Sequence, residues 1–237
     1  MKIGVFGTSM VGQAISGKLA ELGHDVMVGT RDVAKTQANI EPHPYGFPAF
    51  SVWQKEHASV KLGTFADAAK HGEVVFNATN GTGSLEALKL AGESNLNGKV
   101  LVDIANPLDF SQGNPPSLSV SNTDSLGEQI QRAYPNVKVV KTLNTVTAFL
   151  MVNPSLVANA DHTLFVCGND ADAKAQVTEW LKGWFGWKDV IDLGDITNAR
   201  GTEMYLPIWL RLWGALGTGM FNIKVVPECV NDLRHGN

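Results

Sequence analysis

The chain has 237 residues, with 19 lysines and arginines against 23 aspartates and glutamates, so its formal net charge is −4. This balance argues against a nucleic-acid-binding surface, and the length suits one large domain or one domain with a small extension. The two cysteines, Cys167 and Cys229, form no CxxC pair, which argues against a disulfide scaffold or metal knuckle and is typical of the reducing cytosol.

The first predicted element is an apolar strand at Lys2–Phe6. The stretch lacks the long apolar region and cleavage site of a secretory signal, so we expect a cytoplasmic protein. The next apolar residues recur at helical spacing. They predict a helix whose apolar face consists of Val11, Ile15, Leu19 and Leu22.

The turn between this strand and helix carries a dinucleotide-binding motif with one substitution. Gly7, Ser9 and Gly12 occupy the three positions that are usually glycine. Gly7 allows the tight turn and Gly12 the close packing of helix on strand, while Ser9 is small enough to leave room for a pyrophosphate. The N–H groups at the start of the helix would bind that pyrophosphate. The predicted cofactor contacts are Gly7, Thr8, Ser9, Met10, Val11 and Gly12.

The end of the second predicted strand, Asp25–Val28, indicates which dinucleotide the site prefers. Proteins that bind NAD place an acidic residue there for the ribose 2′-hydroxyl, whereas the 2′-phosphate of NADP needs positive charge. This chain has Thr30, Arg31 and Lys35, which favours NADP(H). Asp32 would repel the phosphate unless its side chain turns away to cap the following helix.

Short β-branched runs alternate with helical patterns along the chain, as in parallel βαβ units. Further strands are expected at Val60–Leu62, Val74–Asn77, Val100–Ile104, Val137–Thr142, Thr163–Cys167 and Val190–Leu193. The predicted fold class is α/β, a Rossmann-type doubly wound, mostly parallel sheet with a small C-terminal α/β extension. We place the nucleotide-binding domain at residues 1–146 and the extension at residues 147–237.

The strand ends indicate where the nicotinamide would bind, because ligands of doubly wound sheets lie beyond the carboxyl ends of the strands. The stretches NATNGTGS, DIANPLD and KTLNTV follow the fourth, fifth and sixth strands and are rich in hydroxyl and carboxamide groups. Each asparagine alone is better explained as a loop-forming residue, but together they predict a polar, uncharged crevice. The predicted contacts are Asn77, Ala78, Thr79, Asn106, Pro107, Asn144 and Thr145.

Other chemistry has little support in the sequence. The histidines have no metal-ligand spacing, and no GxSxG motif marks a nucleophilic serine. Lys141 is either a general acid or a solvated lysine, and Cys167 is better explained as a core residue than as a nucleophile. We therefore predict no metal and no catalytic side chain. The rate would then depend on the proximity and orientation of two bound rings.

The C-terminal part should contain helices at Ala171–Trp184 and Asn198–Leu216. The final helix is apolar nearly all round and suits a cleft wall, a dimer interface or a plain core helix. Its apolar stretch is too short and interrupted for a membrane span. Two long irregular stretches, Glu41–Glu56 and Pro107–Thr123, are either lids or plain insertions.

The Gly7–Gly12 turn and the stretches VGTRD, NPLD, VVKTLNT, FVCGND and DLGDITNAR occur in this order along the chain. With them the chain resembles the NADP reductases that depend on the deazaflavin coenzyme F420, and also the cytosolic oxidoreductase domain of the six-transmembrane metalloreductases. The resemblance implies NADP(H) in a Rossmann domain, with Thr30, Arg31 and Lys35 at its 2′-phosphate, and a flavin-like ring in the cleft beside a small C-terminal portion. Ser9 and the Glu41–Glu56 insert depart from the family pattern.

We therefore predict an NADP(H)-dependent oxidoreductase that transfers hydride between the nicotinamide and a deazaflavin (coenzyme F420), FAD or FMN bound in the cleft. The alternatives are an NADP-dependent dehydrogenase or imine reductase of a small organic substrate, and a non-catalytic NADP(H)-sensing module. The expected partners are the small-molecule coenzyme or substrate and a second copy of the chain in a homodimer, with no nucleic acid and no membrane.

Overall fold

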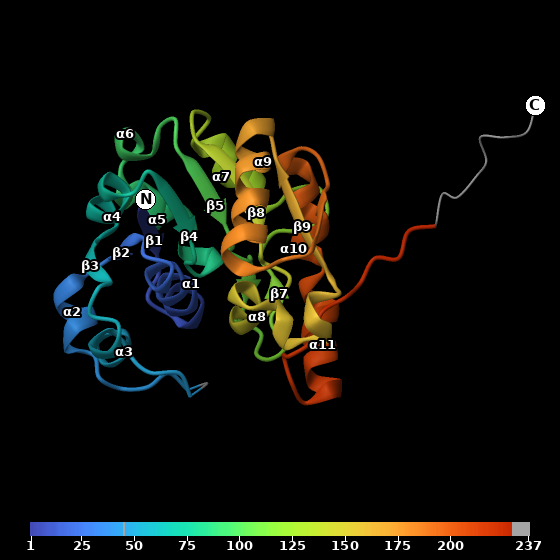
Figure 1. Ribbon diagram of the computed structural model, residues 1–237, viewed down its shortest axis with the longest axis horizontal. Coiled ribbons are helices and arrows are strands. Elements are labelled where there is room, and N and C mark those ends of the chain that lie inside the picture. The colour runs from blue at the N-terminus through green and yellow to red at the C-terminus, as the bar shows by residue number, and fades with distance from the viewer. Residues whose placement is uncertain (45, 229–237) are drawn as a thin grey trace, which may run out of the picture.

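An eight-stranded sheet forms the centre of the protein in the computed structural model, which describes residues 1–44 and 46–228. The strand order is β10-β9-β8-β5-β4-β1-β2-β3. Every neighbouring pair is parallel except β8 and β9, which run antiparallel. Helices cover both faces of this sheet (Figure 1). The predicted Rossmann-type, mostly parallel α/β fold is confirmed.

All the predicted strands are present, because short β-branched runs suit strands that are buried on both faces. Their bounds are β1 (Lys2–Phe6), β2 (Asp25–Thr30), β3 (Lys61–Thr64), β4 (Val74–Asn77), β5 (Val100–Asp103), β8 (Lys138–Thr142), β9 (Thr163–Gly168) and β10 (Asp189–Asp192). Strands β1 and β4 have the predicted bounds, and the others differ only at their ends.

Helices of different lengths connect the strands. They are α1 (Met10–Glu21), α2 (Val33–Ala38), α3 (Phe50–Glu56), α4 (Phe65–His71), α5 (Gly81–Ala91), α6 (Glu93–Leu96), α7 (Leu126–Ala133), α8 (Ala148–Val152), α9 (Ala171–Trp180), α10 (Ala199–Met204) and α11 (Leu206–Leu216). Short helical turns lie at η1 (Pro154–Leu156), η2 (Ala158–Ala160) and η4 (Ile196–Asn198), and the π-helix η3 spans Leu181–Phe185.

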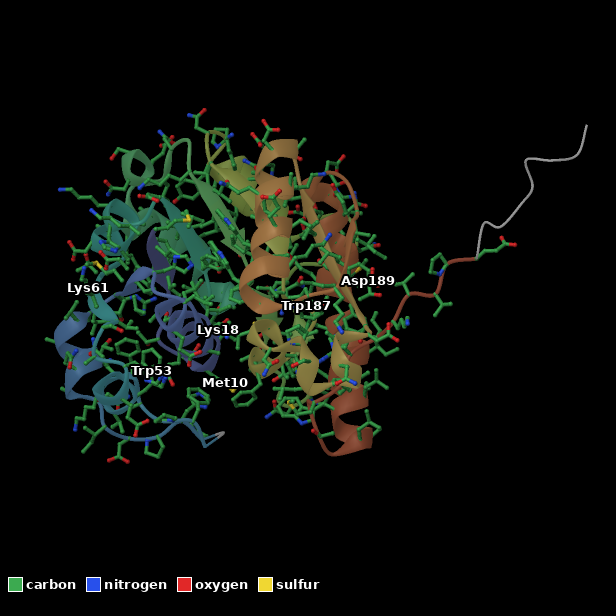
Figure 2. The ribbon with its side chains drawn as sticks, in the orientation of Figure 1. Met10, Lys18, Trp53, Lys61, Trp187 and Asp189 are labelled. Atoms are coloured by element: carbon green, nitrogen blue, oxygen red, sulfur yellow. The ribbon has the colours of Figure 1, made fainter. Side chains whose placement is uncertain are left out.

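Two apolar cores lie on the two faces of the sheet. The first packs Ile15 of α1 and Val177 of α9 against the strands, and the second packs Leu88 of α5 and Ile130 of α7. Trp187, labelled in Figure 2, is buried in the first core, where its Nε1 donates to the Met151 carbonyl at 3.1 Å. The central strands are therefore covered on both faces, which leaves their ends for ligands.

Three helix predictions need correction. Leu22 is 42% exposed because α1 ends at Glu21, so it does not belong to the buried face. The predicted final helix is divided at Tyr205 into α10 and α11, since Pro207 has no N–H to continue the helical ladder. The helix predicted from Ala171 ends as an α-helix at Trp180 and continues as η3.

The two irregular stretches each contain short regular elements. Helix α3 lies in the first, and the second forms a hairpin in which β6 (Leu108–Asp109) pairs with β7 (Ser117–Leu118). Strands β9 and β10 join the same sheet as the N-terminal strands, and the domain division at residue 146 stays a prediction. Cys167 is a buried free thiol, whereas Cys229 lies outside the described residues. No helix in the described part of the chain is long and apolar enough to cross a membrane.

Candidate functional site

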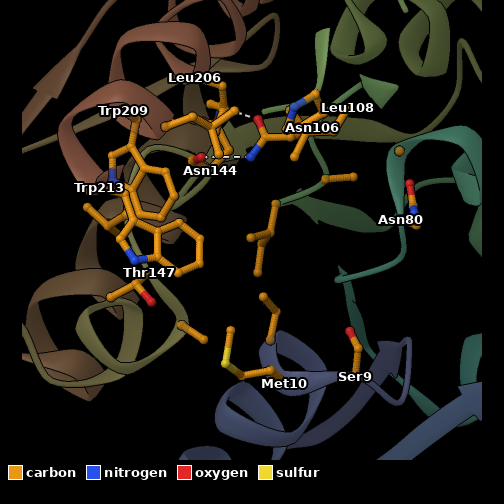
Figure 3. Close-up of a pocket in the computed structure, with 18 of the residues that line it drawn as sticks. Ser9, Met10, Asn80, Asn106, Leu108, Asn144, Thr147, Leu206, Trp209 and Trp213 are labelled. Carbon is orange, nitrogen blue, oxygen red and sulfur yellow. Dashed lines mark hydrogen bonds between the residues drawn. The ribbon is translucent and has the colours of Figure 1, made fainter. Parts of the chain in front are cut away.

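A cavity of about 970 Å³ opens beyond the carboxyl ends of the central strands. Its lining comes from the segments that follow β1, β4, β5 and β8 and from α11, which forms the opposite wall (Figure 3). Strands β1 and β4 are neighbours in the sheet, and the chain leaves them toward opposite edges of it. This is the switch point at which doubly wound sheets bind their ligands.

Some of the predicted contacts line this cavity and others do not. Those that line it are Ser9, Met10, Val11, Ala78, Thr79, Asn106 and Asn144. Those outside its lining are Gly7, Thr8, Gly12, Thr30, Arg31, Lys35, Asn77, Pro107 and Thr145. All of these contacts stay predictions. The surroundings of the main ones in the structure are as follows.

The β1–α1 turn has no room for larger residues. Gly7 has a φ of +111°, and a β-carbon there would lie 2.5 Å from the Ala78 carbonyl oxygen. A β-carbon on Gly12 would clash with the carbonyl of Gly7. Helix α1 therefore begins directly on the turn, and Ser9 at its N-cap makes no side-chain cap bond. The first N–H groups of a helix have no intrahelical acceptor, so this exposed end fits a pyrophosphate.

The corner beyond β2 carries the charges predicted for a 2′-phosphate. Arg31 Nη2 donates to Glu86 Oε2 of α5 at 2.9 Å, and the two side chains are 64% and 57% exposed. Lys35 is exposed, while Thr30 is buried with its Oγ1 2.9 Å from that of Thr36. Asp32 Oδ1 accepts from the Lys35 N–H at 2.9 Å and caps α2. This is the arrangement of Asp32 that the NADP prediction requires.

Hydrogen bonds between strand ends form the polar floor of the cavity. Asn144 Nδ2 donates to Asn106 Oδ1 at 3.0 Å, and Asn106 Nδ2 donates to the Asn144 carbonyl at 2.8 Å (Figure 3). Below the lining, Asn77 Nδ2 donates to Asp103 Oδ1 at 2.8 Å and Asn77 Oδ1 accepts from Thr79 Oγ1 at 2.7 Å. Asn77 thus orients Thr79 from below.

Lys141 lies beneath this floor in a buried group of charges. Its Nζ is 2.9 Å from Asp103 Oδ2 and 2.9 Å from Glu203 Oε1, and it also donates to the Ala105 carbonyl. All three charged side chains are at most 1% exposed. Burial by itself lowers the pKa of Lys141, but the two carboxylates raise this pKa above its usual value. Lys141 is therefore a buried, paired cation outside the cavity lining and not a solvated lysine.

Glu203 connects this charged group to a neighbouring helix. Its Oε2 accepts from the Leu126 N–H at 2.8 Å, and its Oε1 accepts from the Gly127 N–H at 3.0 Å. These are the first N–H groups of α7, which a carboxylate satisfies. The group thereby joins the ends of β5 and β8 to α7 and α10.

The aromatic wall of the cavity contains none of the predicted contacts. Trp209 and Trp213 of α11 meet there with ring centroids 5.4 Å apart (Figure 3). Phe110 and Phe47, from the two irregular stretches, also line the cavity. Of the three interpretations of the final helix, the cavity favours a cleft wall. Among the described residues, no three His, Cys, Asp or Glu side chains are grouped to hold a metal.

The chain is similar to known proteins in both sequence and structure. Residues 2–107 match the family of coenzyme F420-dependent NADP oxidoreductases. A crystal structure from Arthrobacter sp. FB24, of a protein provisionally assigned as an F420-dependent NADP reductase, is 59% identical with a TM-score of 0.92. The alignment covers 96% of this chain and 100% of that one. The chain belongs to this family.

Two curated proteins are similar to the chain at lower identity, and one of them is named as an F420-dependent NADP reductase. The F420-dependent NADP reductase of Methanothermobacter marburgensis is 25% identical over 217 residues, which cover 90% of this chain and 92% of that protein. Metalloreductase STEAP3 of Rattus norvegicus is 25% identical over 227 residues, 93% of this chain. The chain matches only 40% of the length of STEAP3. The predicted NADP-dependent oxidoreductase family is thus confirmed, whereas FAD and FMN receive no support.

Proposed function

We propose that this member of the F420-dependent NADP oxidoreductase family transfers hydride between NADP(H) and the deazaflavin ring of coenzyme F420. The observation that carries the proposal is the form of the cavity, which has Ser9, Met10 and Val11 at the N-terminus of α1 on one side and tryptophan rings on the other. Such a cavity suits two flat ligands that must meet.

The dinucleotide would lie along the ends of β1 and β2. The exposed start of α1 would hold the pyrophosphate, and Arg31 and Lys35 would hold the 2′-phosphate. Thr30 already bonds to Thr36 and contributes mainly to the shape of the corner. The Arg31–Glu86 pair is exposed, and such pairs are worth only about 0–1 kcal/mol. A phosphate that binds the guanidinium through two hydrogen bonds can therefore displace Glu86.

The nicotinamide and the acceptor ring would meet above the Asn106–Asn144 pair. Bound NADPH supplies the hydride. The protein orients the rings and excludes water, because the lining offers carboxamides, hydroxyls and apolar side chains. Of the described lining residues, only Arg211 and His43 carry ionisable side chains. Hydride addition to a deazaflavin leaves a charge that the ring delocalises and water can protonate, whereas a carbonyl would become a strongly basic alkoxide that needs a donor close by. His43 is the one described lining side chain that could serve as that donor, so the composition supports transfer between two rings.

A homodimer and a cytoplasmic location belong to the same proposal. The outer face of α11 supports the dimer, since Ile208 is 54% and Leu216 57% exposed. Apolar faces of this kind often mark contacts between subunits.

The test is NADPH oxidation by the purified protein with one acceptor at a time. Coenzyme F420 should be reduced, whereas a panel of small ketones and imines should leave NADPH unchanged. Turnover with a ketone or imine but not with coenzyme F420 would replace the proposal with the small-substrate alternative. Tight NADPH binding without any turnover would favour the sensing module.

A further inference from the structure

Helix α11 carries one charged side chain, Arg211, in the otherwise uncharged sequence LPIWLRLWGAL. Arg31, Arg132 and Arg200 each pair with a carboxylate at 2.6 to 2.9 Å. Arg211 is the one arginine among residues 1–44 and 46–228 that has no such partner. Arg211 is exposed, so its guanidinium is free to bind an anionic group.

The surroundings of Arg211 leave room for a ligand. Arg211 lines the cavity, and no Asp or Glu of the described chain does so. Gly214 lies three residues further on, on the same side of the helix, and a β-carbon there would meet nothing within 4 Å. A side chain at residue 214 would occupy this space, so the glycine keeps the approach to the guanidinium open.

The position of Arg211 separates it from the dinucleotide. Arg211 lines the cavity from the edge of the α11 wall, because it is two residues from both Trp209 and Trp213 and so leaves the helix about 200° away from them. Ser9 and Asn80 lie across the cavity from the two tryptophan rings (Figure 3). The predicted pyrophosphate contacts and the Arg31 corner are both on the far side from α11. A ligand group bound to Arg211 would thus belong to the second ligand.

We propose that Arg211 binds an anionic oxygen group, a phosphate or a carboxylate, of the acceptor, whose flat ring packs against Trp209 and Trp213. The guanidinium binds such groups through two parallel hydrogen bonds and tolerates an aromatic neighbour. This inference rests on the proposed function in one respect, that the cavity holds a second ligand beside NADP(H). It makes Arg211 a determinant of which acceptors bind.

The test compares three acceptors with one ring and different charge: the uncharged deazaflavin ring compound, its 5′-phosphate, and coenzyme F420 with its phosphate and carboxylates. Their Kd values are measured by calorimetry on the wild type, Arg211→Gln and Arg211→Lys, and KM and kcat are measured with NADPH. The matched control is Lys89→Gln, which removes one positive charge from the exposed far end of α5.

Arg211→Gln should raise Kd and KM for the charged acceptors at least about tenfold, because it removes the charge-assisted hydrogen bonds to the anionic group. The uncharged ring compound and kcat should be unaffected, Arg211→Lys should retain part of the affinity, and Lys89→Gln should match the wild type. If the affinity already falls for the 5′-phosphate compound, Arg211 binds the phosphate. If it falls only for coenzyme F420, Arg211 binds a carboxylate.

Equal losses for charged and uncharged acceptors, or no loss for either, would overturn the proposal. Failure of the proposed function is distinguishable from this, because it would abolish turnover with every ring compound in the wild type. The charge-dependent Kd values would then still decide the role of Arg211.

Discussion

The two sides of the cavity differ in how strictly the backbone dictates their residues. On the β1–α1 side, Gly7 and Gly12 are in contact with main-chain atoms, so glycine is the only residue that fits. On the α11 side, Trp209 and Trp213 contact each other and the cavity, and other large apolar residues could occupy the same space. The first side is suited to a constant ligand, and the second can vary with the acceptor.

The largest expected effect concerns the buried charged group of Lys141, Asp103 and Glu203 beneath the cavity. Lys141→Met should lower the free energy of unfolding by about 3–5 kcal/mol, because it leaves Asp103 and Glu203 buried without their cation. Urea denaturation would measure the change. Lys138→Met on the same strand is the control, since Lys138 is 41% exposed and its pair with Asp170 should matter little. Equal stability of the two variants would contradict the structural role of Lys141.

The second expected effect tests the 2′-phosphate corner. Arg31→Ala should weaken NADPH binding about tenfold or more, because a charge-assisted contact to the phosphate is lost. NADH lacks this phosphate, so its Kd should hardly change. Fluorescence titration with both dinucleotides gives the ratio, and equal losses for the two would refute the assignment.

The third effect tests the steric constraint in the turn. Gly12→Ala should destabilise the protein by about 1–3 kcal/mol, because the new methyl group meets the Gly7 carbonyl. It should also weaken NADPH and NADH alike, since both carry the pyrophosphate. Gly83→Ala on α5 is the matched control, because a β-carbon there would meet nothing within 4 Å. Thermal denaturation and titration would show whether only the first glycine is constrained.

The smallest effect concerns Glu86. Glu86→Gln should improve NADPH binding by no more than about fivefold, because it frees Arg31 from an exposed ion pair of low energy. Binding of NADH should be unchanged, and Glu93→Gln, an exposed acid on α6, should have no effect. Weaker NADPH binding by Glu86→Gln would instead mean that Glu86 positions the arginine.

The β1–α1 side of the cavity could be predicted from the sequence better than the α11 side. The turn and the charged corner could be predicted because local backbone geometry ties Gly7, Gly12 and Arg31 to fixed distances along the chain. The partner of Arg31 could not, since Glu86 is 55 residues away. The burial of Lys141 likewise depends on Glu203, which arrives from a distant helix.

Within the fold, β-branched runs predicted every strand of the large sheet, whereas the bounds of the helices between and after the strands were predicted less well. The division at Tyr205 depends on one proline in a strongly apolar stretch, where periodicity alone indicates a continuous helix. The direction in which Trp209 and Trp213 face had no signal, because α11 is apolar nearly all round and any face could have been buried.

The reversal between β8 and β9 sends the chain away from the cavity, and α10 and α11 bring it back. The number of residues in α10 and at its junction with α11 therefore determines which side chains of α11 face the cavity. One residue inserted after Glu203 would rotate everything beyond it by about 100°, so that different side chains would face the acceptor while the sheet kept its register. Insertions and deletions at this point offer a route by which the same scaffold can change its electron acceptor and keep its coenzyme.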